Sequence, residues 1–384
     1  MRVLVTGAGG SIGIDVCRSL AHLPEVELLG AEASPWGARL AGRFCTQVVP
    51  LPRADREGPE AFCQALARQV DTLGVDFVWI NPDPELQAVA WCGRQPPCAH
   101  PLPGREVLQA CLDKEITGSR LQRAKLAPET LALEVELPAG ADVPGPDAAP
   151  PAEVSQVAQS LLPQLEGAFA RLGVPLWVRP GSGAGGIGSL RVDQPREAAF
   201  WVALWSVRHG VRRWVVQEYL PGRNFNCTLL YASGELVAWA AMQRLGYFLA
   251  ETAPSGITGQ VKLCRTVEQP HVLAAARQAV RLLGAQPHGI YSVDLREDVQ
   301  GRPKVTEINP RLAGRPWLYT QAGCNLPWLA VQVLSGAEPE GTRPHRPRPG
   351  WTLYRQLDCQ PLILPPGETA DEYAHSRAGS ATAT

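Results

Sequence analysis

At 384 residues the chain is too long for one typical domain, so its length predicts two or three lobes with clefts between them. Hydrophobic residues make up 45% and charged residues 19%, as in ordinary globular enzymes, and the net charge of -1 argues against a nucleic-acid or anionic-membrane surface. No apolar run approaches membrane-spanning length, and the first residues leave no room for a signal peptide before the first strand, so we expect a cytoplasmic protein. The ten cysteines show no zinc-like spacing and are interpreted as buried apolar residues.

The first hundred residues alternate strands and helices in the order that builds a parallel sheet. We expect strands at 3–5, 26–30 and 76–81, and helices at 14–23, 59–72 and 83–91. Asp83 has the residue type and position of a helix N-cap. Residues 1–104 are therefore predicted to form a Rossmann-like lobe.

The rest of the chain predicts three further parts and a tail. Residues 105–150 are predicted to form a helical connection, with Asp113 capping its second helix. Residues 151–220 are predicted to form a small lobe, with helices at 153–172 and 195–209 and strands at 176–179 and 213–219. Residues 221–369 read as a larger lobe that contains a hairpin turning at Ser233 and Gly234, and 370–384 as a disordered tail.

A short strand in the larger lobe carries the residues of a metal site. Side chains alternate along a strand, so Glu307, Asn309 and Arg311 share one side of the run 306–311. The turn-rich segment 297–303 folds Asp294 back beside Glu307 as a hairpin. Two carboxylates and an amide oxygen favour Mg²⁺, with Mn²⁺ as a possible substitute, and an adjacent arginine suits phosphate. The alternative is a polar strand edge without a ligand.

Two glycine-rich loops have different interpretations. The loop 7–13 follows a strand and opens a helix, as in NAD-binding folds, but Glu32 is displaced from the position of a ribose-binding acid. NAD binding and tight packing of strand against helix both remain open for this loop. In the loop 179–189, Arg179 precedes five glycines, which suits a flap over phosphate groups better than a simple turn.

Taken in order, these segments resemble the ATP-grasp superfamily, most closely the carbamoyl-phosphate-synthetase-like branch of ATP-dependent ligases. The resemblance covers almost the whole chain. Its elements are the opening 3–10, the turn 81–86, the helix start Asp113-Lys114-x-x-Thr117, the flap after 178–180, the segment 217–222, and Asp294 with 307–311. It implies an α/β fold with a Rossmann-like parallel-sheet lobe, a small flap lobe and a C-terminal antiparallel-sheet lobe.

The resemblance also implies roles for particular residues. ATP would be contacted by Lys114, Arg179, Ser182, Gly185, Gly186, Gln217, Glu218, Tyr219, Leu220 and Asn224. Metal ligands would be Asp294, Glu307 and Asn309, and the catalytic cations Arg311, Arg244 and Arg179. Substrate would be bound by Gly9, Gly10 and the loop 246–259, with Arg315 receiving a carboxylate and Trp317 or Tyr319 lining the pocket, unless these two aromatics simply pack.

Two positions depart from the family pattern. The flap starts with Arg179 where many relatives have Lys, although the carbamoyl-phosphate-synthetase branch uses Arg. The family commonly has Glu where this chain has Asn224, directly before Phe225, so we expect ATP binding with an altered ribose preference.

The implied reaction converts a small carboxylate, such as an amino acid, into an acylphosphate at the expense of ATP. An amine then displaces phosphate to form an amide. The alternatives are an NAD(P)-dependent reductase or epimerase that uses the loop 7–13, and a nucleotide-binding regulatory protein without turnover. Dimers are common among relatives, so a homodimer is a further expectation.

Overall fold

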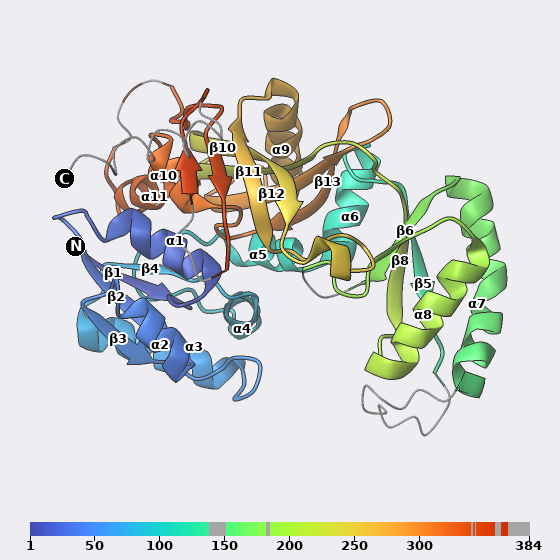
Figure 1. Ribbon diagram of the computed structural model, residues 1–384. Helices are drawn as coiled ribbons and strands as arrows, with labels where there is room; N and C mark the ends of the chain where they lie inside the picture. The colour runs from blue at the N-terminus through green and yellow to red at the C-terminus, as the bar shows by residue number, and fades with distance from the viewer. Residues whose placement is uncertain (138–150, 182–184, 339–340, 342, 358–361, 368–384) are drawn as a thin grey trace, which may run out of the picture.

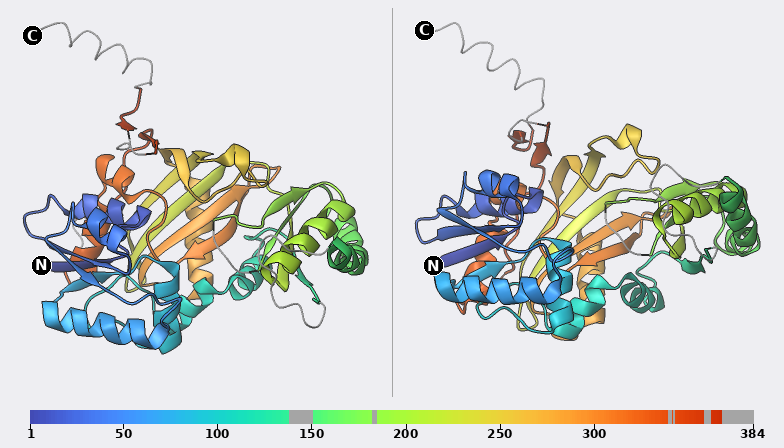
Figure 2. Two further views of the ribbon diagram at one scale, coloured as in Figure 1. Left: turned by 60° about the horizontal axis from the view of Figure 1, so that its bottom comes forward. Right: turned by 90° about the horizontal axis from the view of Figure 1, so that it is seen from below.

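The computed structural model describes residues 1–137, 151–181, 185–338, 341, 343–357 and 362–367 (Figure 1). The predicted disordered tail and Ser182 lie outside these residues, as does the side chain of Lys114. Figure 2 shows the N-terminal part (blue) and a small lobe (green) at opposite ends of the molecule, with a central lobe between them.

The N-terminal lobe has the predicted parallel sheet, in the strand order β3-β2-β1-β4. Its elements are β1 (Arg2–Thr6), α1 (Ser11–Leu20), β2 (Glu27–Glu32), α2 (Pro35–Ala41), β3 (Gln47–Pro50), α3 (Pro59–Leu73), β4 (Phe77–Trp79) and α4 (Asp83–Cys92). Strand β1 places Leu4 in a core with α3 and α4, and Val3 and Val5 in a second core with α1. Helix α1 begins three residues earlier than predicted, and α2 and β3 were not predicted.

The small lobe is a four-stranded antiparallel sheet in the order β5-β8-β6-β7. Its elements are β5 (Thr130–Glu134), α7 (Pro151–Leu172), β6 (Leu176–Pro180), β7 (Leu190–Val192), α8 (Pro195–His209) and β8 (Arg213–Glu218). Helices α7 and α8 pack on this sheet through a common hydrophobic core. Strand β5 was not predicted, because it falls in the segment interpreted as a helical connection.

The central lobe is built on a seven-stranded sheet in the order β13-β12-β9-β10-β11-β14-β15. Its elements are α5 (Arg105–Leu112), α6 (Lys114–Arg123), β9 (Asn224–Ala232), β10 (Glu235–Tyr247), the 3-10 helix η1 (Ala250–Thr252), β11 (Val261–Val267), α9 (Pro270–Leu283), β12 (Gly289–Glu297), β13 (Pro303–Asn309), α10 (Pro316–Gln321), α11 (Leu326–Leu334), β14 (Thr352–Tyr354) and β15 (Leu362–Leu364). The predicted hairpin is confirmed, with Ser233 and Gly234 both at positive φ between β9 and β10.

Hydrophobic cores lie on both faces of the central sheet. One face of the central sheet is covered by α5, α6 and α9. The other face shares a core with β1, α1, α10 and α11, which joins the N-terminal and central lobes into one body. Among the described helices, none is long and apolar enough to cross a lipid bilayer.

Candidate active site

A cavity of about 580 Å³ lies where the three lobes meet. Its wall includes residues from the N-terminal lobe, the small lobe, the segment that connects them and the central sheet. The predicted site residues on this wall are Arg179, Gly185, Gly186, Gln217, Glu218, Tyr219, Leu220, Asn224, Arg244, Asp294, Glu307, Asn309, Arg311 and Arg315. Segments that lie far apart in the sequence therefore converge on one cavity.

Four predicted substrate residues do not line this cavity. Gly9 and Gly10 lie in the turn just before α1, whose first two residues, Ser11 and Ile12, do line it. Tyr319 is completely buried in the core shared by the two larger lobes, so packing accounts for it. Trp317, two residues before it on α10, is only partly exposed.

The hairpin of β12 and β13 brings the predicted metal ligands together. Asp294 lies directly opposite Glu307, while Ile308 points into the core beneath them. The register shifts after this pair, leaving Thr306 as the extra residue of a β-bulge. Thr306 therefore also lines the cavity, although strict alternation predicted it on the other face.

The donor set at this hairpin fits Mg²⁺ better than softer metals. Asp294, Glu307 and Asn309 offer two carboxylates and an amide oxygen, which are hard oxygen ligands. In the described residues no cluster of three or more His, Cys, Asp or Glu side chains could hold a metal ion. A metal at this hairpin would therefore depend on the amide and on groups from a bound nucleotide or water for the rest of its shell.

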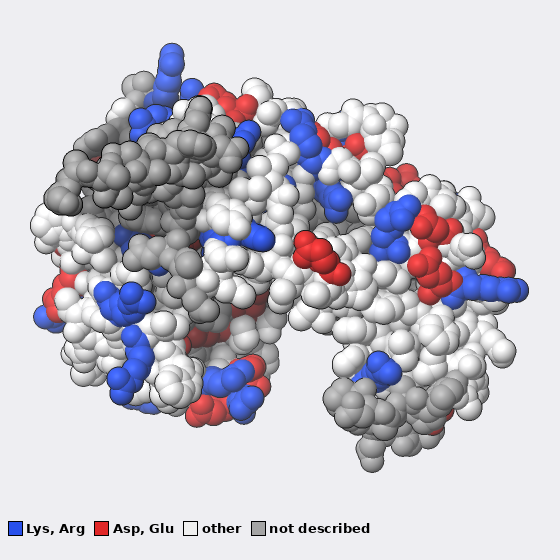
Figure 3. All heavy atoms as spheres, in the orientation of Figure 1, with Lys and Arg blue, Asp and Glu red and all other residues white. Residues whose placement is uncertain are grey.

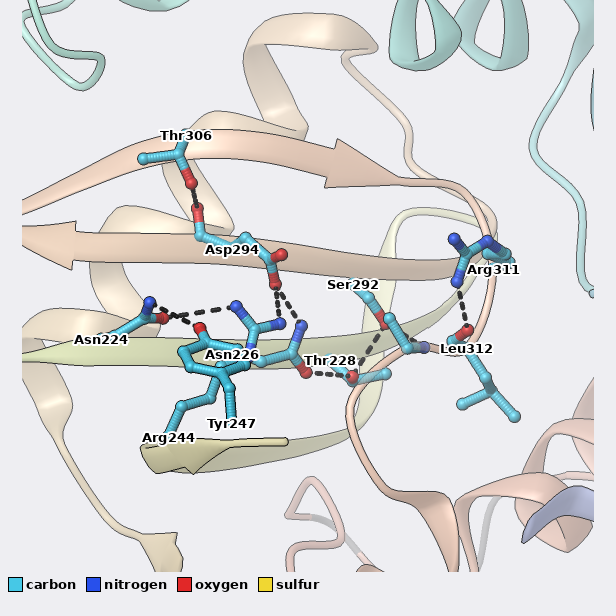
Figure 4. Close-up of polar contacts among 11 residues, drawn as sticks. Asn224, Asn226, Thr228, Arg244, Tyr247, Ser292, Asp294, Thr306, Arg311 and Leu312 are labelled. Carbon is cyan, nitrogen blue, oxygen red and sulfur yellow. Dashed lines mark hydrogen bonds and ion pairs between the residues drawn. The ribbon is translucent and has the colours of Figure 1, made fainter. Parts of the chain in front are cut away.

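Asp294 is held by two donors in this structure (Figure 4). Its Oδ1 accepts hydrogen bonds from Nη2 of Arg244 and Nδ2 of Asn226, each at 2.7 Å. Burial alone would lower the pKa of Arg244, but the neighbouring Asp294 carboxylate raises it above its usual value. Nη1 of Arg244 also donates to Oδ1 of Asn224 at 3.3 Å, and Nδ2 of Asn224 donates to the Tyr247 hydroxyl at 3.0 Å.

A chain of small polar groups continues below Asp294 (Figure 4). The Thr228 hydroxyl donates to Oδ1 of Asn226 at 3.2 Å and lies 2.9 Å from the Ser292 hydroxyl. Oγ of Ser292 in turn accepts from the backbone N–H of Ala313 at 2.9 Å. This chain ties the position of Asp294 to the loop that carries Arg311 and Arg315.

Arg311 is oriented from the N-terminal lobe. Its Nε and Nη2 donate to the two carboxylate oxygens of Asp83 at 2.6 and 3.0 Å, and its Nη1 donates to the carbonyl of Leu312 at 3.1 Å. The prediction that Asp83 caps a helix is wrong, because Pro82 is the N-cap of α4 and no side chain caps it. Asp83 instead forms a fork-shaped pair with a guanidinium on the cavity wall.

Arg179 on β6 and the last residues of β8 line another part of the cavity. Arg179 donates from Nη2 to the Thr306 carbonyl at 3.4 Å, and burial lowers its pKa while Glu307 opposes that shift. Gln217 is fixed by a 2.8 Å hydrogen bond from its Nε2 to the hydroxyl of Thr130. Burial raises the pKa of Glu218, whose Oε1 has no hydrogen-bond partner among the described residues.

Two loops meet over the cavity. A Cβ atom added to Gly259 would lie 2.6 Å from Cα of Gly185, and one added to Gly186 would lie 2.8 Å from the carbonyl oxygen of Ile257. Such distances require backbone to move, so only glycine allows the predicted flap and the loop 255–259 to approach this closely. Together the two loops form a lid over one side of the cavity, which both of them line.

The glycine-rich turn 7–13 packs tightly against neighbouring parts of the N-terminal lobe. The Gly9 N–H donates to Oε1 of Glu32 at 2.6 Å, so the carboxylate considered for a ribose already has a partner. A Cβ atom on Gly9 would lie 2.2 Å from the Gly37 carbonyl oxygen, and one on Gly13 would lie 2.1 Å from that of Gly7. These contacts support the packing interpretation and not the NAD alternative.

Sequence reasoning missed several residues of the site. Asn226 supports Asp294, and Arg296 and Trp177 line the cavity, as does Tyr247, which falls within the predicted substrate loop 246–259. A signal for Asn226 was present in β9, where Asn224, Asn226 and Thr228 alternate with apolar residues on a strand whose other residues are apolar. The cavity-lining aromatics have no comparable pattern.

Space-filling atoms show both charge signs interspersed on the face seen in Figure 3, without an extended field of one sign. The same view shows a deep notch between the small lobe and the N-terminal lobe. The charge pattern on this face agrees with the near-zero net charge of the chain.

Comparisons with known proteins agree with this architecture. Residues 210–352 match the family model described as "ATP-grasp in the biosynthetic pathway with Ter operon". No protein with a curated description matches the chain.

Similar solved structures include the L-amino acid ligase from Bacillus licheniformis, with 17% identity, a TM-score of 0.60, and coverage of 92% of this chain and 78% of that one. The N5-carboxyaminoimidazole synthetase from Staphylococcus aureus has 14% identity, a TM-score of 0.61, and coverage of 92% and 81%. The biotin carboxylase from Campylobacter jejuni has 14% identity, a TM-score of 0.60, and coverage of 91% and 74%. The predicted architecture is thus confirmed: the chain has the ATP-grasp fold, and its residues 210–352 match an ATP-grasp family.

Proposed function

We propose that the protein is an ATP-dependent ligase that forms a carbon–nitrogen bond. A small carboxylate attacks the γ-phosphate of ATP, which gives an acylphosphate and ADP. An amine then attacks the acyl carbon and phosphate leaves, so an amide is formed.

The observation that carries this proposal is the composition of one cavity. Asp294, Glu307 and Asn309 share it with five arginines, among them Arg179, Arg244 and Arg311. Hard oxygen ligands beside guanidinium groups are what phosphoryl transfer needs, because that reaction depends on alignment and charge neutralisation more than on a covalent nucleophile. The similar structures support the same reaction class, since they include an L-amino acid ligase and an N5-carboxyaminoimidazole synthetase, one of them solved with ADP.

Nucleotide binding and phosphoryl transfer would take place in different parts of the cavity. Adenine would lie against the backbone of 217–220, with the ribose near Asn224. Bound Mg²⁺ would neutralise phosphate charge at Asp294, Glu307 and Asn309. Arg311 would steady the transferred phosphoryl group and Arg315 would receive the carboxylate, while the lid keeps water from the acylphosphate.

One incubation tests the reaction class. The protein is mixed with Mg²⁺-ATP, amino acids and other small carboxylates, with hydroxylamine present to trap an acylphosphate as a hydroxamate. We expect ADP, phosphate and hydroxamate. Formation of AMP and pyrophosphate would contradict the acylphosphate route.

A matched pair of variants ties the chemistry to the hairpin. Glu307→Gln removes one carboxylate and should lower ADP formation by about 100-fold or more, as expected when a charge-stabilising group is lost. Glu235→Gln makes the same change at an exposed position of the same sheet and should keep full activity. Full activity in Glu307→Gln would remove the hairpin from the mechanism.

A further inference from the structure

The side chain of Asn224 has a protein partner at each end of its amide (Figure 4). Asn224 begins β9, and its backbone lies opposite Arg244 on β10 and Arg296 on β12. Its Oδ1 accepts a hydrogen bond from Nη1 of Arg244 at 3.3 Å, and its Nδ2 donates to the Tyr247 hydroxyl at 3.0 Å. The contact that sequence analysis expected between this amide and a ribose is therefore replaced by contacts within the protein.

Arg244 fixes which way the amide faces. The guanidinium is held by the 2.7 Å hydrogen bond from its Nη2 to Oδ1 of Asp294. A guanidinium has only donor groups, so the amide atom that faces Arg244 must be the oxygen. The amide nitrogen is left to face Tyr247, and because it only donates, the Tyr247 hydroxyl must accept.

The Tyr247 hydroxyl consequently keeps its own proton for another partner. A phenolic hydroxyl can donate one hydrogen bond while its oxygen accepts one. Among the described residues, no group accepts a hydrogen bond from this hydroxyl. Tyr247 lines the cavity next to Asn224, so its free donor is available to a ligand there.

The neighbouring strand adds a further donor and no acceptor. Arg296 lines the same cavity, and the Cζ atom of its guanidinium lies 5.5 Å from the centre of the Tyr219 ring. Its Nε has no hydrogen-bond partner among the described residues. Arg244, Asn224 and Arg296 thus form a row across three strands, in which the one amide oxygen already accepts from Arg244. This part of the wall is suited to a ligand atom that accepts hydrogen bonds.

A second cavity, of about 500 Å³, adjoins the first at this row. Asn224, Tyr247 and Arg296 line both cavities, and residues 253–257 contribute to the wall of the second one. A group attached to a ligand oxygen beside Tyr247 would therefore have room in the second cavity.

We propose that Tyr247 determines how the ribose is recognised: its hydroxyl donates a hydrogen bond to the 2′- or 3′-oxygen of the nucleotide. The inference rests on the proposed function, which lays the ribose of ATP near Asn224. An ionised carboxylate, as the family commonly has in place of Asn224, could only accept from a ribose hydroxyl. Here the direction of the hydrogen bond is reversed, so the ligands of this site include adenine nucleotides whose 2′- or 3′-oxygen carries a substituent.

Modified nucleotides reveal the direction of this hydrogen bond. Binding to Mg²⁺ and ADP is compared, by titration calorimetry, with binding to the 2′-deoxy, 2′-O-methyl, 3′-deoxy and 3′-O-methyl forms of ADP. A methyl ether keeps the oxygen that accepts but has no proton to donate, whereas a deoxy sugar has neither. At one of the two positions the deoxy form should bind about fivefold or more weakly, and the ether within about threefold of ADP, as expected for one neutral hydrogen bond.

Two results of this comparison would overturn the proposal. Equal affinities for all five nucleotides would mean that the protein makes no contact with a ribose oxygen. Ethers that bind as weakly as the deoxy forms at both positions would mean that the ribose hydroxyl donates, or that the second cavity gives the substituent no room.

The variant Tyr247→Phe locates the donor. It should reduce the difference between ADP and the deoxy form from about fivefold to less than about twofold, because the contact that the deoxy form lacks is already missing. Tyr354→Phe removes the hydroxyl of an exposed tyrosine on the same sheet, outside both cavities, and should keep the wild-type ratio. Each ratio compares two ligands on one variant, so a general loss of stability does not alter it. A wild-type ratio in Tyr247→Phe would refute the role of Tyr247.

The variant Asn224→Asp should reverse the pattern. It replaces Nδ2 by a second oxygen, which would accept from the Tyr247 hydroxyl and turn its proton away from the ribose. The ether should then lose its advantage and bind no more tightly than the deoxy form. If the ether keeps its advantage in Asn224→Asp, the orientation derived from Arg244 is wrong.

The binding measurement separates this inference from the proposed function, because it requires no turnover. If the expected affinities are found while no acid gives ADP or hydroxamate from ATP, the ligase proposal fails and the ribose contact stands. If hydroxamate forms while the ethers bind like the deoxy forms, the ribose contact fails and the ligase proposal stands. Failure of ADP to bind at all would overturn both.

Discussion

The pair between Asp83 and Arg311 offers a sharp test of how the N-terminal lobe contributes to phosphoryl transfer. Asp83→Asn removes the negative charge and one of the two acceptors at 2.6 and 3.0 Å from the guanidinium. A hydrogen bond to a charged group contributes about 1.5–3 kcal/mol. The Asp83 side chain is 34% exposed and that of Arg311 16%, so solvent screening favours the lower end of this range. A loss of about 1.5 kcal/mol in the transition state corresponds to roughly a tenfold lower kcat.

The assay is steady-state ADP release with saturating Mg²⁺-ATP and acid, because the expected effect is on kcat and not on the KM for ATP. Asp55→Asn is the matched control, since it breaks a 2.6 Å pair with Arg53 in which both side chains are more than 40% exposed. Thermal unfolding of both variants shows whether the lobes remain docked. If Asp83→Asn folds normally and keeps the wild-type kcat, Arg311 does not need this orientation and the reasoning is refuted.

Two further predictions concern a buried carboxyl group and the lid. Burial raises the pKa of Glu85 to about 8, so the stability that its protonated form contributes is complete below about pH 4.5 and is lost as the pH rises towards 8. The free energy of unfolding of Glu85→Gln should therefore exceed that of wild type by an amount that grows from about pH 5 to about pH 8 and reaches up to a few kcal/mol. The control Glu60→Gln, at an exposed position, should show no such trend. Gly259→Ala should hold the lid apart and raise the ratio of phosphate released to hydroxamate formed, whereas Gly256→Ala, at nearly the same φ but with nothing within 4 Å of its added Cβ, should leave this ratio unchanged. If both variants raise this ratio equally, backbone strain, and not the contact with Gly185, causes the effect.

The sequence was most informative where the geometry is local. The alternation along 306–311 and the turn-rich segment before it predicted that Asp294 and Glu307 face each other, as they do in β12 and β13. The sequence also predicted that Asp113 caps α6, and this is confirmed, since Oδ1 of Asp113 accepts a hydrogen bond from the N–H of Ile116 at 3.0 Å. Such features depend on a few neighbouring residues, which a single sequence displays directly.

Contacts between distant segments could not be predicted in the same way. Asp83 and Arg311 are 228 residues apart, and nothing local distinguishes an aspartate that caps a helix from one that binds a remote arginine. Tyr319 was considered for the substrate pocket because it follows Arg315, yet the packing of α10 against α1 buries it completely. Tertiary packing decided both outcomes.

The attachment of the small lobe has a mechanical consequence. The chain enters this lobe at β5 and leaves it at β8, and these two strands are hydrogen-bonded neighbours from Thr130 and Gln217 onwards. The Glu218 N–H also donates to the Glu129 carbonyl at 2.9 Å, so the two crossings run as one ribbon up to the central lobe. A two-stranded ribbon bends more easily across its flat face than within its plane, because in-plane bending would stretch hydrogen bonds. The small lobe should therefore swing about a single axis, which carries the flap on a repeatable arc towards the central sheet.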